Sequence, residues 1–184
     1  MKIFNLIWLI MILMVLNGCA QSSALIKTSS TSVRTDVFQE LTNASPVPQE
    51  SADLHITATL KTHKPGVYSA KDPHGTPDYT LLVNVDGQVA VLRGNLQTEA
   101  DGVRYSFSKD LRLKGGIHSI VVALPGDRIA VKKEITLLNG EVNNLVLEPV
   151  YGTVSEKKRP SATKVTSFEE GIRGVRLTLD GRGL

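Results

Sequence analysis

Residues 103–113, VRYSFSKDLRL, decide the fold because apolar and polar side chains alternate along them. The apolar positions are Val103, Tyr105, Phe107, Leu111 and Leu113, and Arg, Ser and Asp stand between them. Successive side chains of a strand point to opposite faces of its sheet. The alternation therefore predicts a β-strand with one face in a core and the other in solvent.

The same alternation recurs on both sides of this stretch. Turn pairs separate the runs: Asp86-Gly87 and Asn139-Gly140 suit type I′ hairpins, and Pro125-Gly126-Asp127 turns the chain between two further runs. Strands are expected over 54–61, 79–85, 88–93, 103–113, 117–124, 128–138 and 142–149, with an eighth over 172–179. No segment here has sustained helical periodicity. The pattern predicts an all-β fold, an antiparallel β-sandwich of seven or eight strands with Ig-like or transthyretin-like architecture.

The N-terminus has the form of a secretory signal. Lys2 precedes Leu6–Leu16, an unbroken run of 11 apolar residues. As a helix, such a run rises about 16 Å, roughly half of the 30 Å hydrocarbon core of a bilayer. The run is therefore typical of a signal-peptide core rather than of a stable transmembrane span.

The end of this run resembles the signal of bacterial lipoproteins, the lipobox. Leu16, Asn17 and Gly18 lead directly to Cys19, the single cysteine of the chain. The resemblance implies diacylglyceryl transfer to the Cys19 thiol, cleavage after Gly18 and acylation of the new amino group. Two or more acyl chains suffice for stable anchoring. The alternative is a plain secretory signal with an incidental cysteine.

The resemblance also implies a location. Because Ala20 rather than Asp follows Cys19, a Gram-negative cell would carry the protein in its outer membrane. The acyl chains on Cys19 are then the contact with the membrane.

Composition divides the rest of the chain. Residues 20–52 contain 11 Ser or Thr among 33 and are expected to form a flexible tether, with a short docked helix over 33–42 as an alternative. The expected organisation is a signal peptide over 1–18, the lipidated cysteine and tether over 19–52, a β-sandwich over 53–151, and a polar tail with an edge strand over 152–184. Within the tail, Lys157, Lys158 and Arg159 are expected to lie in a solvated loop.

Residues 79–150 are similar to PEGA-type and carboxypeptidase-regulatory-like β-modules. Leu113–Gly116 provides their Leu-x-x-Gly turn, and a strand, a Pro-Gly turn and an Asn139-Gly140-Glu141 hairpin follow in the family order. The Val85-Asp86-Gly87 hairpin is similar as well. The resemblance implies a non-catalytic extracytoplasmic module that serves in attachment or as a scaffold.

Charge and motifs exclude several classes of function. The 21 Lys and Arg nearly balance the 18 Asp and Glu, which argues against a nucleic-acid partner. A single cysteine excludes an intrachain disulfide. The chain has no Gly-x-Ser-x-Gly elbow, phosphate loop or dinucleotide fingerprint. We therefore expect neither catalysis nor a cofactor.

The histidines and tyrosines are the remaining candidates for a ligand site. The histidines lack the spacing of a zinc site. Asp72 and Asp78 lie near His63 and His74 in one loop, but no metal site is expected. The tyrosines would form a sugar-stacking platform only if they shared a face. The histidines are His55, His63, His74 and His118, and the tyrosines are Tyr68, Tyr79, Tyr105 and Tyr151.

Together these features predict a lipid-anchored protein of the bacterial cell envelope whose β-sandwich binds an envelope protein or polysaccharide. Two alternatives remain: a hydrolase of envelope polysaccharide or peptidoglycan, and an accessory subunit of a secretion or surface-fibre complex.

Overall fold

The computed structural model describes residues 22–43, 45–65, 72–152, 168 and 171–184. A helix covers 22–29. The strands are β1 (Phe38–Leu41), β2 (Ser51–Thr62), β3 (Thr80–Val85), β4 (Gln88–Arg93), β5 (Asn95–Thr98), β6 (Val103–Lys114), β7 (Gly116–Leu124), β8 (Ile129–Leu137), β9 (Val142–Tyr151), β10 (Ile172–Leu179) and β11 (Arg182–Gly183), and a 3₁₀ turn, η1, covers Pro125–Asp127.

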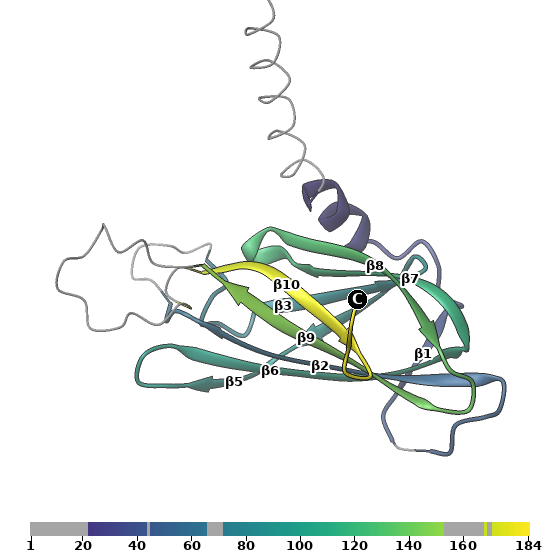
Figure 1. Cartoon of the computed structure of the whole chain (residues 1–184). Coiled ribbons are helices and arrows are strands. Elements are labelled where there is room, and N and C mark those ends of the chain that lie inside the picture. The colour runs from purple at the N-terminus through teal and green to yellow at the C-terminus, as the bar shows by residue number, and fades with distance from the viewer. Residues whose placement is uncertain (1–21, 44, 66–71, 153–167, 169–170) are drawn as a thin grey trace, which may run out of the picture.

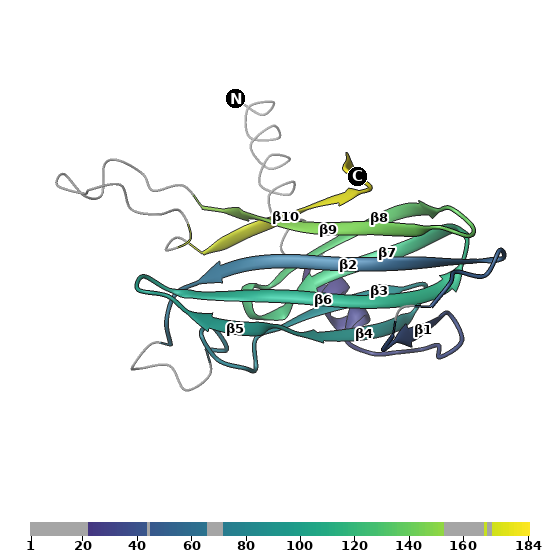
Figure 2. The same ribbon diagram turned by 90° about the horizontal axis from the view of Figure 1, so that it is seen from below.

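Two sheets pack face to face, which confirms the predicted all-β sandwich (Figure 1). The large sheet has the order β1-β6-β2-β9-β10-β11, with β5 also paired to β6, and the small sheet has the order β4-β3-β7-β8. Figure 2 shows the large sheet in front of the small one. All pairings are antiparallel except that of β2 with β9, so the large sheet is mixed rather than purely antiparallel.

The core lies between the sheets and follows the predicted alternation. In β6 the five apolar residues identified above are all at most 4% exposed. β2 contributes alternate residues from Ala52 to Leu60, and β3 is buried almost throughout because it is a central strand of the small sheet.

The hairpin turns were predicted only in part. Asp86 and Gly87 both have positive φ, as a type I′ turn requires. At the second predicted site only Gly140 has positive φ, so that turn is of another type. The pair with two positive φ values that was not predicted is Asp180-Gly181, which joins β10 to β11.

The prediction that residues 20–52 form a flexible tether was wrong for much of that segment. Residues 22–29 are helical, and β1 pairs with β6 over four residues. Phe38 of β1 is 8% exposed and belongs to the core, which excludes the alternative helix over 33–42. Burying one aromatic ring outweighs the polar composition around it.

The side-chain amide of Gln88 completes the docking of β1. Gln88 Oε1 accepts hydrogen bonds from the backbone N–H groups of Val37 (2.8 Å) and Phe38 (3.1 Å). Gln88 Nε2 donates to the Phe38 carbonyl at 3.0 Å. Gln88 therefore serves as a strand partner for β1 and links the two sheets at this edge.

The sandwich also includes residues beyond its predicted C-terminal boundary at residue 151. β10 pairs with β9 on one side and β11 on the other, and Ile172 and Leu177 are buried. Residues 171–184 are therefore part of the sandwich, whereas the basic cluster 157–159 lies outside the described residues.

Candidate functional site

The predicted lipidation site, Leu16 to Cys19, lies outside the described residues. The chain after it is already attached to the sandwich within about a dozen residues. Val33 N donates to the Gly87 carbonyl at 2.9 Å, and Val89 N donates to Ser32 Oγ at 2.8 Å. Ser29 at the end of the helix is fully buried. Among the described residues, no helix is both long and apolar enough to cross a membrane.

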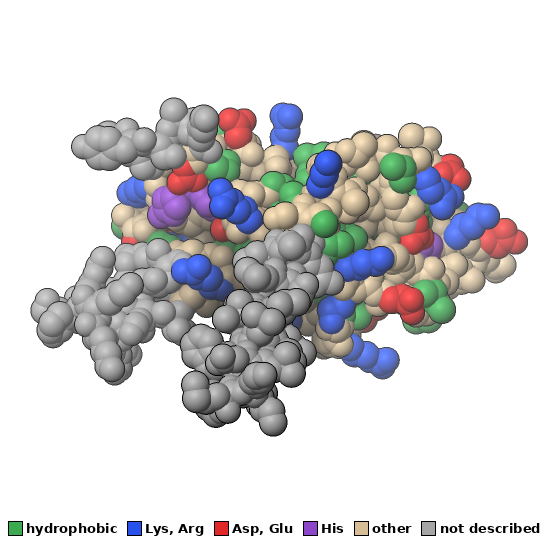
Figure 3. Space-filling model, turned by 90° about the horizontal axis from the view of Figure 1, so that it is seen from above, with side chains coloured by type: hydrophobic (Ala, Val, Ile, Leu, Met, Phe, Trp, Pro, Cys, Tyr) green, Lys and Arg blue, Asp and Glu red, His purple; other side chains and the backbone are tan. Residues whose placement is uncertain are grey.

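The densest cluster of titratable side chains lies at the end of β3 that is remote from Gly87, where β2 ends and β3 begins. His63 follows β2 directly, and Asp72 and His74 belong to the segment that leads into β3. Their ligating atoms lie within 4.8 Å of one another. In Figure 3, histidine side chains lie beside acidic ones near one end of the visible face.

Asp72 is the centre of this group. Its Oδ2 lies 2.9 Å from His63 Nε2, and its Oδ1 lies 2.5 Å from His74 Nδ1. Oδ1 also accepts the backbone N–H of His74 at 3.0 Å. Partial burial by itself would raise the pKa of Asp72, but these hydrogen bonds outweigh it and lower the pKa to about 2.

His74 stands between two carboxylates. Its Nε2 lies 3.1 Å from Asp127 Oδ1 of η1, whose side chain is only 6% exposed. Tyr79 Oη donates to Asp127 Oδ2 at 2.6 Å. The hydrogen bond to Asp127 raises the pKa of His74; burial opposes that effect, and Asp72 adds to it. Two carboxylate partners require both ring nitrogens to carry protons when nothing else is bound.

The surrounding packing holds these side chains in place. The Tyr79 ring packs in a tilted arrangement against His74, with ring centroids 5.1 Å apart, and against Tyr105, with centroids 4.8 Å apart. Tyr105 Oη donates to the Thr76 carbonyl at 2.8 Å, which fixes the segment before β3 to the core. Burial raises the pKa of Tyr79, with Asp127 adding to the shift, so the phenol remains a hydrogen-bond donor.

Gly75 lets the two halves of the loop approach each other. Its φ is +74°, and a Cβ there would lie 2.3 Å from Pro65 Cδ and 2.7 Å from Pro65 N. Only glycine tolerates both the conformation and the contact. Close packing of Pro65 on Gly75 therefore keeps His63 beside Asp72 and His74.

The other histidines form separate pairs. His55 lies on the outer face of β2, as predicted, and its Nδ1 is 2.5 Å from Asp110 Oδ1 on the neighbouring strand. His118 Nδ1 is 2.7 Å from Asp86 Oδ2, and its Nε2 is 2.8 Å from the Lys114 carbonyl. Neither pair includes a second histidine.

The tyrosines do not form an exposed platform. Tyr79 and Tyr105 are at most 1% exposed and pack in the core, and Tyr151 is partly buried with its Oη accepting Lys61 N–H at 2.7 Å. Tyr68 lies outside the described residues. A stacking surface for sugars is therefore not formed by the three described tyrosines.

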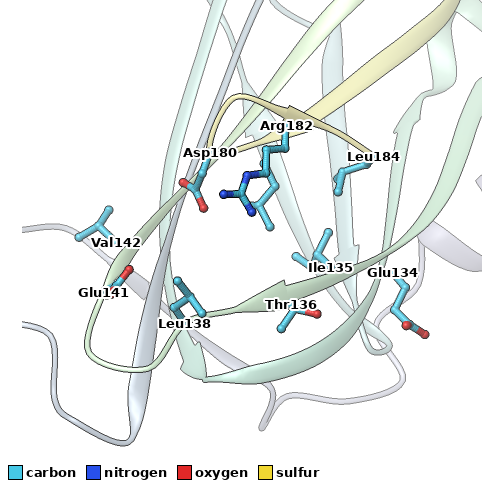
Figure 4. A pocket seen from close by; sticks show the side chains of 10 residues that line it. Glu134, Ile135, Thr136, Leu138, Glu141, Val142, Asp180, Arg182 and Leu184 are labelled. Carbon is cyan, nitrogen blue, oxygen red and sulfur yellow. The ribbon is translucent and has the colours of Figure 1, made fainter.

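A hollow of about 600 Å³ opens where β8 meets the β10–β11 hairpin. Figure 4 shows Asp180, Arg182 and Leu184 facing Ile135, Thr136 and Leu138 across it. Its lining mixes apolar side chains, such as Ile135 and Leu184, with charged ones, such as Asp180 and Arg182.

The sequence places His63, Asp72 and His74 in one loop, but it did not predict that their side chains converge. Asp127 was missed as part of the group, because it comes from a turn 53 residues after His74. No family model matches the chain, and no similar curated protein or solved structure was found.

Proposed function

We propose that this protein is a lipid-anchored component of the bacterial cell envelope, with a non-catalytic β-sandwich that serves as a binding or scaffold module. The observation that carries this proposal is the position of the single cysteine. Cys19 follows an 11-residue apolar run and the Leu16-Asn17-Gly18 tripeptide, where lipoprotein processing requires it. The similarity of residues 79–150 to PEGA-type modules supports a scaffold role.

The docked N-terminal segment limits how far the sandwich could stand from the bilayer. Two residues, Ala20 and Gln21, separate Cys19 from the helix at 22–29, and an extended chain spans at most about 3.6 Å per residue. Acyl chains on Cys19 would therefore hold the domain close to the lipid surface. The contacts at Ser32 and Val33 favour a module that acts near the membrane rather than on a long spacer.

Metabolic labelling tests the anchor. Cells that express the chain are grown with a clickable palmitate analogue, and the label and the membrane fraction are followed for wild type, Cys19→Ala and the matched exposed variant Ser30→Ala. Label and membrane association should be lost in C19A and kept in S30A. Persistence of both in C19A, or a mature N-terminus other than Cys19, would refute lipid anchoring.

Two further measurements separate this proposal from the alternatives. Turnover of peptidoglycan or polysaccharide fragments by the purified protein would refute the non-catalytic role. Stoichiometric co-purification with subunits of a secretion or fibre complex from cross-linked membranes would replace a free-standing module by an accessory subunit.

A further inference from the structure

We propose that His63, Asp72 and His74 form a binding site for a divalent transition-metal ion, with Zn²⁺ as the ion that fits the ligands. The proposal does not depend on the lipid anchor. Of the residues that the structure describes, these three form the one group whose metal-ligating atoms converge, within 4.8 Å of one another.

The separations of the ligand atoms are close to those of a zinc site. A tetrahedral Zn²⁺ site with ligand distances of 2.0–2.1 Å places neighbouring ligand atoms about 3.3 Å apart. His63 Nε2 and His74 Nδ1 now lie 2.9 and 2.5 Å from the two oxygens of Asp72. An ion between them therefore requires the nitrogens to move slightly away from the Asp72 oxygens, and the His63 side chain, which is 47% exposed, has room to rotate.

The hydrogen bonds show which atoms would bind. The His63 Nε2 and His74 Nδ1 atoms both point at the Asp72 carboxylate, and each contact needs a proton on that nitrogen. A metal ion takes the place of these protons, because a neutral imidazole offers its lone pair to the metal. Binding would therefore release protons and leave Asp72 as the third ligand.

The remaining nitrogen of His74 already has the partner that a metal-bound histidine requires. Metal-binding imidazoles usually donate their other N–H to a carboxylate, which fixes the tautomer and ring orientation. His74 Nε2 faces Asp127 Oδ1 at 3.1 Å, and Tyr79 holds the other oxygen of Asp127 at 2.6 Å. With a metal ion on Nδ1, His74 needs only the proton on Nε2, which it donates to Asp127.

A fourth position is open to water. His63 is 47% exposed, and beside the two histidines lies a hollow of about 50 Å³, more than the roughly 10–15 Å³ that one water needs. Lys61 also lines this hollow, but its ammonium pairs with Glu99 at 2.8 Å and Asp101 at 2.7 Å. These partners offset the positive charge near the site.

The ligand set selects the type of ion. Two imidazoles and one carboxylate suit Zn²⁺ and its neighbours Co²⁺, Ni²⁺ and Cu²⁺, whereas Ca²⁺ takes six to eight oxygens. The site also spans only 12 residues of sequence, so an ion would tie the end of β2 to the segment before β3.

Isothermal titration of the full chain in detergent with ZnCl₂ tests the site. His63→Gln and Asp72→Asn each remove one ligand at a partly exposed position, and circular dichroism checks their folding. His55→Gln is the matched control, because His55 also faces an aspartate on the surface but has no second histidine nearby. Titration with CaCl₂ tests ion type.

We expect one Zn²⁺ per chain with a submicromolar dissociation constant, tenfold or more weaker binding in H63Q and D72N, and no change in H55Q. Cobalt should give the intense visible bands of tetrahedral coordination. Absence of Zn²⁺ binding, or equal affinity in wild type, H63Q and D72N, would overturn the proposal. Equal or tighter binding of Ca²⁺ would overturn the choice of metal. If either variant misfolds, nitrogen NMR of wild type decides: Zn²⁺ must shift His63 Nε2 and His74 Nδ1 but leave His55 unchanged.

Discussion

Replacing Gln88 by alanine tests whether the segment after the anchor is part of the folded domain. Gln88 makes three hydrogen bonds to the backbone of Val37 and Phe38, and they hold β1 at the junction of the two sheets. Without the amide, two N–H groups and one carbonyl lose their partners. β1 then keeps its four-residue pairing with β6, the buried ring of Phe38 and the ion pair of Glu40 with Lys109.

The expected loss follows from these contacts. A net hydrogen bond contributes about 0.5–1.5 kcal/mol, and the two N–H donors share one oxygen. Because the site is partly exposed, water replaces part of what is lost. Q88A should therefore lower the free energy of unfolding by about 2 kcal/mol, a large fraction of the 5–15 kcal/mol of a typical domain.

Urea unfolding and amide exchange measure the effect. The amides of Val37 and Phe38 should exchange at least tenfold faster in Q88A, while those of β2 and β6 keep their order. Gln39→Ala is the control, because Gln39 lies in the same strand with an exposed side chain and should change stability by less than about 0.5 kcal/mol. A loss below about 0.5 kcal/mol in Q88A with unchanged exchange would mean that β1 is not docked and that the predicted tether is correct.

Three further predictions concern the loop and its surroundings. Gly75→Ala should destabilise the protein by about 2–3 kcal/mol in urea, because left-handed backbone strain of about 1 kcal/mol adds to the Pro65 contact, whereas Gly140→Ala, with φ +73° and open space, should cost only about 1 kcal/mol. The hydrogen bond from Arg104, with that from Lys61, lowers the pKa of Glu99 to about 2. The contribution of ionised Glu99 to stability is therefore present above pH 4.5 and lost as the pH falls toward 2. In Arg104→Met, carboxyl NMR titration should show that the pKa of Glu99 is higher than in wild type. If the proposed site binds Zn²⁺, a free concentration of 100 times the dissociation constant should raise the unfolding free energy by about 2.7 kcal/mol, and EDTA should reverse it.

The strands that could be predicted are those whose pattern carries the information locally. β6 and β2 alternate over most of their length, and each is paired on both sides. β5 was missed because all four of its residues are exposed, so no period marks it. β1 was missed because one buried residue, Phe38, among polar neighbours does not distinguish a strand from a linker. Both strands pair with β6, a partner that their own local patterns do not reveal.

The pairing of strands that are distant in sequence could not be predicted, for a related reason. Turn residues determine only which consecutive strands form hairpins, and β2 lies between β6 and β9, neither of which is its neighbour in sequence. The same holds for the histidine group. Its three ligating side chains come from one loop, but Asp127 and Tyr79 meet it only when η1 packs on the start of β3.

β3 connects the two regions on which the proposals rest. It begins next to Tyr79, beneath the histidine group, and it ends at the Asp86-Gly87 turn, where Val33 of the N-terminal segment attaches. Its six residues span about 20 Å at 3.3 Å per residue. An anchor that holds the Gly87 end near the lipid therefore leaves the metal-binding end about 20 Å along the sandwich, joined to it by a strand that is buried along most of its length. Because β3 pairs with β4 on one side and β7 on the other, binding of Zn²⁺ near its Tyr79 end should leave the position of the sandwich relative to the membrane unchanged.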